Sequence, residues 1–427
     1  MSMLRQLVAQ LEDIFYLCGS GNHPFHYQLR CDRCCGFGQD EYCGIIMAAD
    51  WDTSHRCESS SAKKCRVESK DESHPELVMH EEIWKELPPD LLEAVISRLP
   101  IASLFRFRSV CKKWNTFPNS LTFCSQWGSA TRSEPWFYVA TERSISGGTA
   151  YDPSSMKVYH LGISDFPENT WVEPVASAKG LVCFVDYGDQ VFYVCNPLTK
   201  AVKRLPVPIT KNWSQLCVGM SMNDDGNYKI LLVSSYGDYD VYDSKKGLWI
   251  NPGCLPSFIK LPLLLNLRSQ SITVDQTIYL MTYEPEGMVS YDLSSGEWNQ
   301  YLIPSPVYLS WHTLAECNGR IMLAGLVSKN AASCFCIWEL QKMSCLWKEV
   351  DRMPNVWCLD FYGKYMTMVS LGNKGLILMC LRSEHGNLLV TYDMNTREWV
   401  RIPAHMLGVC KSIARGAAFY PCISSMP

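Results

Sequence analysis

Cysteine and histidine side chains gather near the start of this 427-residue chain, where they offer the chemistry of a zinc site. Seven of the 21 cysteines and five of the nine histidines lie in residues 1–80. Thiolates and imidazoles are the ligands of structural zinc, but the spacing supplies only one Cys-x-x-Cys pair. We therefore expect free thiols in a partly flexible arm and no resident metal or cofactor. The alternative zinc ligands are Cys31, Cys34, Cys35 and Cys43, with His23 and His26 upstream.

The sequence shows no pattern of a common enzyme active site. It contains no nucleophile elbow, no phosphate-binding glycine loop and no His-Glu-x-x-His helix. The histidines beyond residue 100 are far apart in the chain, at His160, His312, His385 and His405. We therefore expect a protein that is not an enzyme. The remote alternative is a propeller enzyme, in which a β-propeller fold brings distant loops together to form an active site.

Residues 87–114 carry apolar side chains at helical spacing. Pro88 and Pro89 stand where the first turn of a helix has no use for a backbone N–H, and Pro100 ends that helix. A second short helix follows, and Trp114 opens a third turn. Three amphipathic helices of this size cannot bury all their apolar surface against one another, so they need a partner. The first stripe consists of Leu91, Leu92, Val95, Ile96 and Leu99.

This helical stretch resembles an F-box, the module that docks on the Skp-type adaptor of Skp-cullin ubiquitin ligases. The resemblance covers the motif without a gap, and Asp90 and Ser103 also match it. It implies an adaptor-binding surface formed by Leu87, Pro88, Leu91, Leu92, Ile96, Leu99, Pro100, Leu104, Val110, Cys111 and Trp114. The alternative is an ordinary three-helix element packed on its own downstream domain.

Length and composition narrow the class of protein. With 47% hydrophobic residues, the chain can bury a large core and form two or three domains. A net charge of -4 gives no reason to expect nucleic-acid or membrane binding. No apolar run reaches the roughly eighteen residues of a membrane helix, and no secretory signal is visible, so we expect a protein of the nucleus or the cytoplasm or both.

Beyond residue 134 the periodicity changes from helical to short strands. Runs of β-branched, aliphatic or aromatic residues are bounded by turn residues, at 135–139, 180–185, 228–233, 277–281, 320–325 and 375–381. Hardly any of this region has the pattern of a long helix. It therefore predicts an all-β domain.

The strand region also repeats. An acid or amide after an apolar strand recurs every 44 to 54 residues, at Asp152, Asn196, Asp243, Asp292, Glu339 and Asp393. A large apolar residue follows six positions after each of these residues, except in the fifth copy, where the separation is two positions longer. These apolar residues are Val158, Val202, Trp249, Trp298, Trp347 and Trp399. A period near 47 residues predicts four-stranded blades in a closed ring, with residues 417–420 supplying a closing strand beside Trp136.

The repeats resemble degenerate kelch repeats, although the usual glycine pair is missing and only Gly325 lies near a suitable place. The whole chain resembles a plant F-box/kelch-repeat protein. We therefore expect a multidomain chain in which a short all-α F-box of three helices precedes an all-β propeller with six kelch-like blades. The expected divisions are an N-terminal arm at 1–80, the F-box at 81–120, a linker at 121–134 and the propeller at 135–422.

The resemblance implies the substrate-recognition subunit of a Skp-cullin-F-box ubiquitin ligase. Its partners would be a Skp-type adaptor, through it a cullin, and an unidentified protein target on the propeller. Three tryptophans outside the repeat offset are the candidate target-binding residues: Trp213, Trp311 and Trp357. The alternatives are an F-box scaffold or transcriptional co-regulator that causes no degradation, and, for the tryptophans, a role in capping blade edges.

Overall fold

The computed structural model describes residues 89–99, 101–108, 136–141, 147–163, 166, 172–210, 213, 216–259, 271–329, 332–359, 366–383, 386–403 and 413–427. The chain consists of two compact units, and the boundary between them lies between Thr131 and Arg132. The described part of the first unit contains two helices, α3 (Pro89–Ile96) and α4 (Ile101–Arg108). The prediction of a helix that begins at the paired prolines is therefore confirmed. None of the described helices is long and apolar enough to span a membrane.

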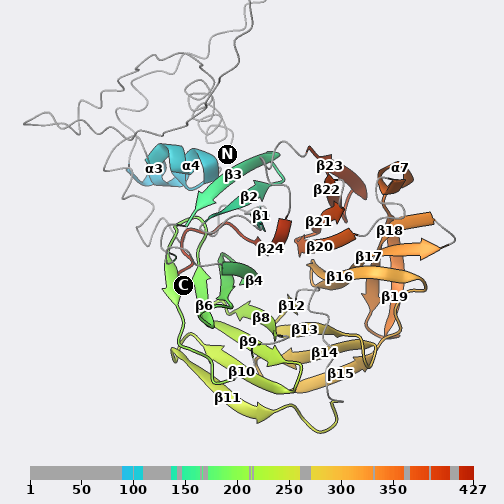
Figure 1. The fold of residues 1–427 in the computed structure, drawn as a ribbon. Helices are drawn as coiled ribbons and strands as arrows, with labels where there is room; N and C mark the ends of the chain where they lie inside the picture. Colours follow the sequence, from blue (N-terminus) through green and yellow to red (C-terminus); the bar gives the residue numbers. More distant parts are fainter. Residues whose placement is uncertain are drawn as a thin grey trace, which may run out of the picture. The chain divides into compact units, whose positions relative to one another are not determined.

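The second unit is built from six four-stranded antiparallel sheets, which follow one another around a common centre (Figure 1). Blade 1 contains β24 (Ile413–Phe419), β1 (Trp136–Thr141), β2 (Gly147–Asp152) and β3 (Lys157–Gly162). Blade 2 contains β4 (Val172–Ala178), β5 (Leu181–Asp186), β6 (Val191–Cys195) and β7 (Val202–Arg204). Blade 3 contains β8 (Leu216–Met222), β9 (Tyr228–Ser234), β10 (Asp238–Asp243) and β11 (Leu248–Cys254).

The remaining three blades have the same order of strands. Blade 4 contains β12 (Ile272–Val274), β13 (Thr277–Thr282), β14 (Gly287–Asp292) and β15 (Trp298–Leu302). Blade 5 contains β16 (Leu309–Cys317), β17 (Arg320–Lys329), β18 (Ala332–Gln341) and β19 (Leu346–Arg352), followed by the helix α7 (Asn355–Cys358). Blade 6 contains β20 (Met366–Asn373), β21 (Leu376–Ser383), β22 (Gly386–Asp393) and β23 (Glu398–Ile402). The six-bladed propeller predicted from the repeat is confirmed.

The C-terminal strand closes the ring. β24 pairs with β1 in antiparallel register, with Trp136 opposite Phe419 and Tyr138 opposite Ala417. The first blade thus takes its innermost strand from the end of the chain and its other three strands from the beginning of the propeller. The predicted closing strand is confirmed, and β1 has no unpaired edge.

The apolar runs recognised in the sequence all became the second strand of a blade, namely β1, β5, β9, β13, β17 and β21. Every residue of β5 is buried, because neighbouring sheets cover both of its faces. The hydrophobic clusters accordingly join adjacent blades. One cluster packs Leu181 and Phe192 of blade 2 against Ile230 and Trp249 of blade 3. Burial on both faces explains why these strands show continuous apolar runs instead of alternation.

One hairpin turn recurs between the third and fourth strands. Asp243 accepts hydrogen bonds from the backbone N–H groups of Lys245 at 2.9 Å and Lys246 at 3.3 Å. Asp292 and Asp393 make the same pair of bonds in their own blades. Four positions after the turn residue, the backbone has a positive φ in five blades, at Met156, Lys200, Gly247, Gly296 and Arg397, and blade 5 has a positive φ at Cys345. The side chain of the acid or amide therefore sets a turn that ends in a left-handed residue.

In blade 5 the expected turn residue was wrong by two positions. Glu339 lies inside β18, opposite Lys348, and the turn begins at Gln341, whose carbonyl accepts a hydrogen bond from Cys345 N–H at 2.9 Å. Leu340 is the residue paired with Trp347, as Tyr242 is paired with Trp249 in blade 3. The fifth repeat is thus not stretched, because its turn starts later than its acidic residue suggested.

The innermost strands hold neighbouring blades together through side-chain hydroxyls. Ser177 of β4 donates to the carbonyl of Ala418 in β24 at 2.6 Å. Thr273 of β12 donates to the carbonyl of Met220 in β8 at 2.8 Å. At Gly372 of β20, an added Cβ would lie 2.1 Å from the carbonyl oxygen of Glu316, so no larger residue fits there. These strands enclose a central cavity of about 280 Å³.

Candidate functional site

The described helices of the first unit divide the predicted docking residues into exposed and buried ones. Leu91, in the first turn of α3, is 48% exposed. Ile96, Leu99 and Leu104 are fully buried. An exposed leucine can lose water-accessible surface to a partner, whereas a buried one stabilises the helices themselves. Among the described docking candidates, Leu91 therefore keeps exposed apolar surface, and its contact with an adaptor stays a prediction.

The end of α3 is fixed by local hydrogen bonds. Ser97 donates from its hydroxyl to the carbonyl of Ala94 at 3.0 Å, and Leu99 N–H donates to the carbonyl of Ile96 at 3.1 Å. These bonds satisfy carbonyl groups that a helix end would otherwise leave open. The two helices are thus separated by a tight turn that leads to the proline at position 100.

Several predicted site residues fall outside the described residues. They include the remaining docking candidates Leu87, Pro88, Pro100, Val110, Cys111 and Trp114, as well as the side chain of Leu92. The candidate zinc ligands Cys31, Cys34, Cys35 and Cys43 also lie there, with His23 and His26. Among the residues that are described, no group of three or more His, Cys, Asp or Glu side chains is arranged to hold a metal ion. Of the later histidines, His160 lies on β3 and His312 on β16, in different blades.

The three candidate target-binding tryptophans lie at the margins of the blade cores. The ring of Trp213 is 5.4 Å from the ring of the buried Phe192, between blades 2 and 3. Trp311 on β16 and Trp357 on α7 both pack, partly buried, against the cluster between blades 5 and 6. The structure therefore brings two of the three to one cluster and places the third elsewhere. A contribution to target binding stays a prediction for all three.

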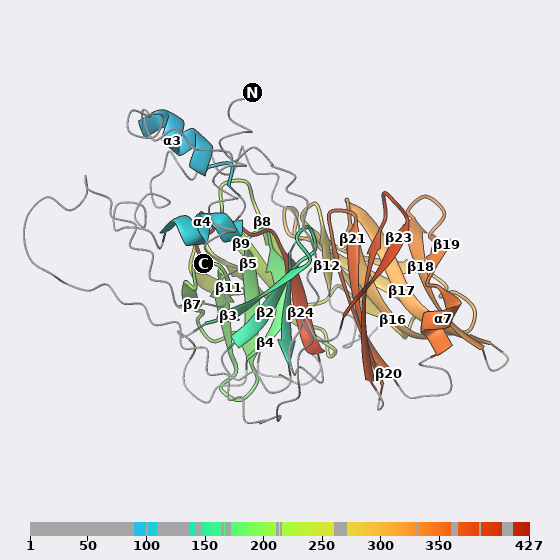
Figure 2. The same ribbon diagram turned by 90° about the horizontal axis from the view of Figure 1, so that it is seen from above.

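Exposed apolar side chains gather on one face of the propeller. Because the strands alternate in direction, the turns between second and third strands share one end of the ring with the connections between blades (Figure 2). We call this end the apolar face and the opposite end the polar face. Of the exposed large apolar residues in the described part of the propeller, ten lie on the apolar face: Tyr187, Val207, Ile209, Tyr236, Phe258, Tyr283, Val307, Tyr308, Val356 and Leu359. The polar face carries three: Met156, Met343 and Met426.

Three tyrosines form a regular part of the apolar face. Tyr187, Tyr236 and Tyr283 occupy the turn after the second strand in blades 2, 3 and 4, and they are 42%, 61% and 48% exposed. Tyrosine combines a large apolar ring with a polar tip, and it is enriched at the centre of protein interfaces. A concentration of exposed apolar side chains at one end of a domain is a candidate interaction surface.

Charged groups lie beside this tyrosine row, at the same end of the innermost strands. Arg415 of β24 and Glu173 of β4 form an ion pair of 2.9 Å between blades 1 and 2. Burial raises the pKa of Tyr187, while the nearby Arg415 charge opposes that rise and Glu173 adds to it. The apolar face therefore offers aromatic surface and, next to it, both signs of charge.

The sequence carries a signal for two of these tyrosines that is separate from the repeat of turn residues and tryptophans. Tyr187 and Tyr236 each precede a glycine directly after the second-strand region of a blade. A bulky aromatic next to a turn glycine has no buried strand position available to it, so exposure follows once the strand ends are known.

Comparison with known families agrees with both parts of this architecture. Residues 84–126 match the F-box domain. Residues 149–405 match the family described as "F-box protein At3g26010-like, beta-propeller". The second match alone covers more than half of the chain, and the two do not overlap.

Curated relatives match the chain over most of its length. "F-box only protein 6" of Arabidopsis thaliana is 43% identical over 461 residues, covering 99% of this chain and 98% of the relative. "F-box/kelch-repeat protein At3g61590" of the same plant is 28% identical, covering 79% of this chain and 88% of the relative. "Protein UNUSUAL FLORAL ORGANS", also of Arabidopsis thaliana, is 27% identical over 75% of this chain and 79% of its own length. With its F-box followed by six antiparallel blades, this chain belongs to the plant F-box proteins that carry a β-propeller.

Proposed function

We propose that this chain is the substrate-recognition subunit of a Skp-cullin-F-box ubiquitin ligase. The observation that carries the proposal is the presence, in one chain, of an F-box match at 84–126 and a propeller with an exposed apolar face. F-box proteins are in general non-catalytic adaptors, and Leu91 offers exposed apolar surface to a Skp-type adaptor. We expect the protein to work in the nucleus, the cytoplasm or both.

The proposed contribution to ubiquitin transfer is proximity. The F-box binds the adaptor and, through it, a cullin, while the propeller binds a target protein. Two binding sites on one chain convert an encounter in solution into a local one, with an effective concentration that the linkage sets. No residue of this chain then needs to form or break a bond.

The adaptor half of the proposal is tested by titrating a purified plant Skp-type adaptor into the full chain by calorimetry. We expect the wild type to bind and Leu91→Asp to bind at least about tenfold more weakly, because burying one leucine is worth roughly 1.5 to 3 kcal/mol. Leu346→Asp is the matched control, since Leu346 is a 51% exposed leucine on the propeller strand β19. A folded wild type that fails to bind the adaptor would refute the proposal.

The target half requires a reconstituted adaptor-cullin complex containing the chain. Proteins that the complex both captures and ubiquitinates are scored against two variants, Tyr236→Arg on the apolar face and Met343→Arg on the polar face. We expect the first variant to lose the targets and the second to keep them. Captured proteins that are neither ubiquitinated nor turned over would support an F-box scaffold instead.

A further inference from the structure

Three cysteine thiols meet at one end of blade 5. Cys334 and Cys336 lie two positions apart on β18, so their side chains share one face of the strand. Cys358 is the last residue of α7. Cys334 packs against the buried cluster that contains Cys358, and the side chains of Cys336 and Cys358 both lie within interaction range of its thiol.

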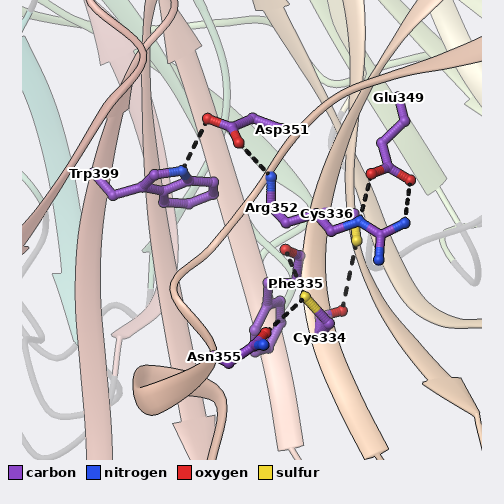
Figure 3. A network of polar contacts seen from close by, with 8 residues as sticks. All are labelled: Cys334, Phe335, Cys336, Glu349, Asp351, Arg352, Asn355 and Trp399. Atoms are coloured by element: carbon purple, nitrogen blue, oxygen red, sulfur yellow. Dashed lines mark hydrogen bonds and ion pairs between the residues drawn. The ribbon is translucent and has the colours of Figure 1, made fainter.

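The three thiols differ in access to solvent. Cys336 and Cys358 are each only 2% exposed, whereas Cys334 is partly exposed. The sulfur of Cys334 also lies 3.8 Å from Oδ1 of Asn355, the first residue of α7 (Figure 3). A small reagent from solution therefore reaches the Cys334 thiol first, because the thiols of Cys336 and Cys358 are buried.

A fixed positive charge stands beside the cluster. Arg352 at the end of β19 faces Cys336 across the strand pair. Its guanidinium forms a two-point ion pair with Glu349, with N–O distances of 2.5 and 2.9 Å (Figure 3). Its backbone N–H donates to the carboxylate of Asp351, which in turn accepts a hydrogen bond from the Trp399 ring at 3.2 Å. These contacts hold Arg352 in place, and the Glu349 carboxylate offsets part of its charge near the thiols.

The surroundings favour the thiolate of Cys334 over those of its neighbours. Hydrogen bonds from Cys336 and Cys358 hold the pKa of Cys334 well below its ordinary value, and the Arg352 charge adds to the shift against the effect of burial. Donation to Cys334, together with burial, raises the pKa of Cys336 and of Cys358. Cys334, the partly exposed member of the cluster, is thus also the thiol that forms the thiolate most readily.

We propose that Cys334 is a peroxide-reactive thiol and that Cys358 converts its oxidised form into a Cys334–Cys358 disulfide. The thiolate of Cys334 attacks one oxygen of hydrogen peroxide, an S–O bond forms, the O–O bond breaks, and hydroxide leaves and takes up a proton. The Cys358 sulfur then attacks the sulfenic sulfur of Cys334, an S–S bond forms, and water leaves. Two thiols lose two electrons in total, and one peroxide becomes two waters.

Cys358 is the resolving thiol because it comes from a different element. Alternate residues of an extended strand stand too far apart, with parallel Cβ directions, for Cys334 and Cys336 to form an unstrained disulfide. Cys334 and Cys358 approach from β18 and α7 instead. Their disulfide would tie α7 to the blade, and Val356 of α7 and Leu359 directly after it belong to the apolar face.

The test treats the reduced full-length protein with a small excess of hydrogen peroxide, blocks the remaining thiols and maps disulfides by mass spectrometry without reduction. We expect the Cys334–Cys358 linked peptide to form first. In Cys358→Ser, dimedone should instead label Cys334 as its sulfenic acid, and Cys334→Ser should abolish both products. Arg352→Gln should slow the reaction.

The matched control is Cys254, an exposed thiol that lies 3.8 Å from the Asp238 carboxylate. Cys254→Ser should leave the linked peptide unchanged, and Cys334 should react at least about tenfold faster than Cys254. The wild-type map needs no variant to fold. Absence of the linked peptide in folded wild type, or oxidation of Cys254 at an equal rate, would overturn the proposal.

Discussion

The side-chain amide nitrogen of Asn196 lies 2.8 Å from the carbonyl oxygen of Cys422, 226 positions further along the chain. The same nitrogen donates to the carbonyl of Ser425 at 2.8 Å, and the side-chain oxygen accepts a bond from Leu198 N–H at 3.0 Å. Asn196 is fully buried. One amide thus sets a turn in blade 2 and also anchors the tail that follows the closing strand.

Changing Asn196 to Asp should destabilise the propeller. Aspartate keeps the acceptor that the turn needs, but it loses the donor to two carbonyls and places a buried charge against them. We expect a loss of about 2 to 4 kcal/mol in the free energy of unfolding. Hydrogen exchange should localise the loosening to residues 420–427, and thermal unfolding should give the size of the loss.

The control for this variant is the converse change, Asp243→Asn, at the same turn position of blade 3. Asn retains the acceptor for Lys245 and Lys246, so stability should hardly change. Equal losses in the two variants would show that the turn, and not the tail, accounts for the effect.

Glu316 should make stability depend on pH. It lines the central cavity with Asp275, and burial, reinforced by the Asp275 charge, raises the pKa of Glu316 above its ordinary 4.5. The folded state then binds the proton more readily than the unfolded state, so this group favours folding as pH falls through the raised pKa toward 4.5. Glu316→Gln keeps an acceptor for Gly319 N–H, which now lies 2.8 Å away.

We therefore expect Glu316→Gln to be more stable than wild type at pH 8 and the difference to shrink toward pH 4.5. Thermal unfolding across this range, with the exposed Glu297→Gln as control, measures the effect. A difference that grows as pH falls would contradict the assigned direction.

Trp249 should contribute more to stability than the tryptophan at the same position of blade 5. Its indole N–H donates to the carbonyl of Pro206 at 2.7 Å, and its ring lies 5.3 Å from that of Tyr242. It is only 6% exposed, whereas Trp347 is partly exposed. We expect Trp249→Leu to cost about 2 to 3 kcal/mol in urea unfolding and Trp347→Leu clearly less; equal costs would be inconsistent with this ranking.

Two positions of α3 should separate folding from docking. Ile96→Asp places a charge at a fully buried position, so we expect the amides of α3 and α4 to lose protection from hydrogen exchange. Leu91→Asp should leave that protection unchanged, because Leu91 is half exposed. Loss of protection in both variants would assign Leu91 to the helix core instead of to the docking surface.

The sequence predicted the second strands, the recurring turns and the closing strand, because each has a strong local pattern. It did not predict the innermost strands of the other five blades. These are rich in small and polar residues, since Ser177 and Thr273 bond to neighbouring blades and Gly372 must admit the backbone of another strand. These requirements arise from contacts between neighbouring blades, so they produce no repeating pattern along the sequence. The shift to Gln341 was missed for a related reason, because an acidic residue two positions earlier imitated the turn signal.

The full motif was enough to identify the F-box. The sequence did not predict that Leu91 is exposed and Ile96 is buried, because helical spacing places both residues on one stripe. The apolar face was also missed. It consists of single residues in turns that are far apart in sequence, and only the arrangement of blades brings those turns to one end. Local patterns thus identified the modules, and tertiary structure determined which residues they present.

The position of β24 in the first blade also bears on synthesis of the protein. A ribosome makes β1, β2 and β3 early, but the strand that completes their sheet is β24, which follows all the other described strands in the chain. The inner edge of β1 therefore stays unpaired until β24 has been made and can pair with it. A premature stop codon between β23 and β24 yields a ring with an open sheet edge, a product that chaperones and proteases can distinguish from the full-length protein.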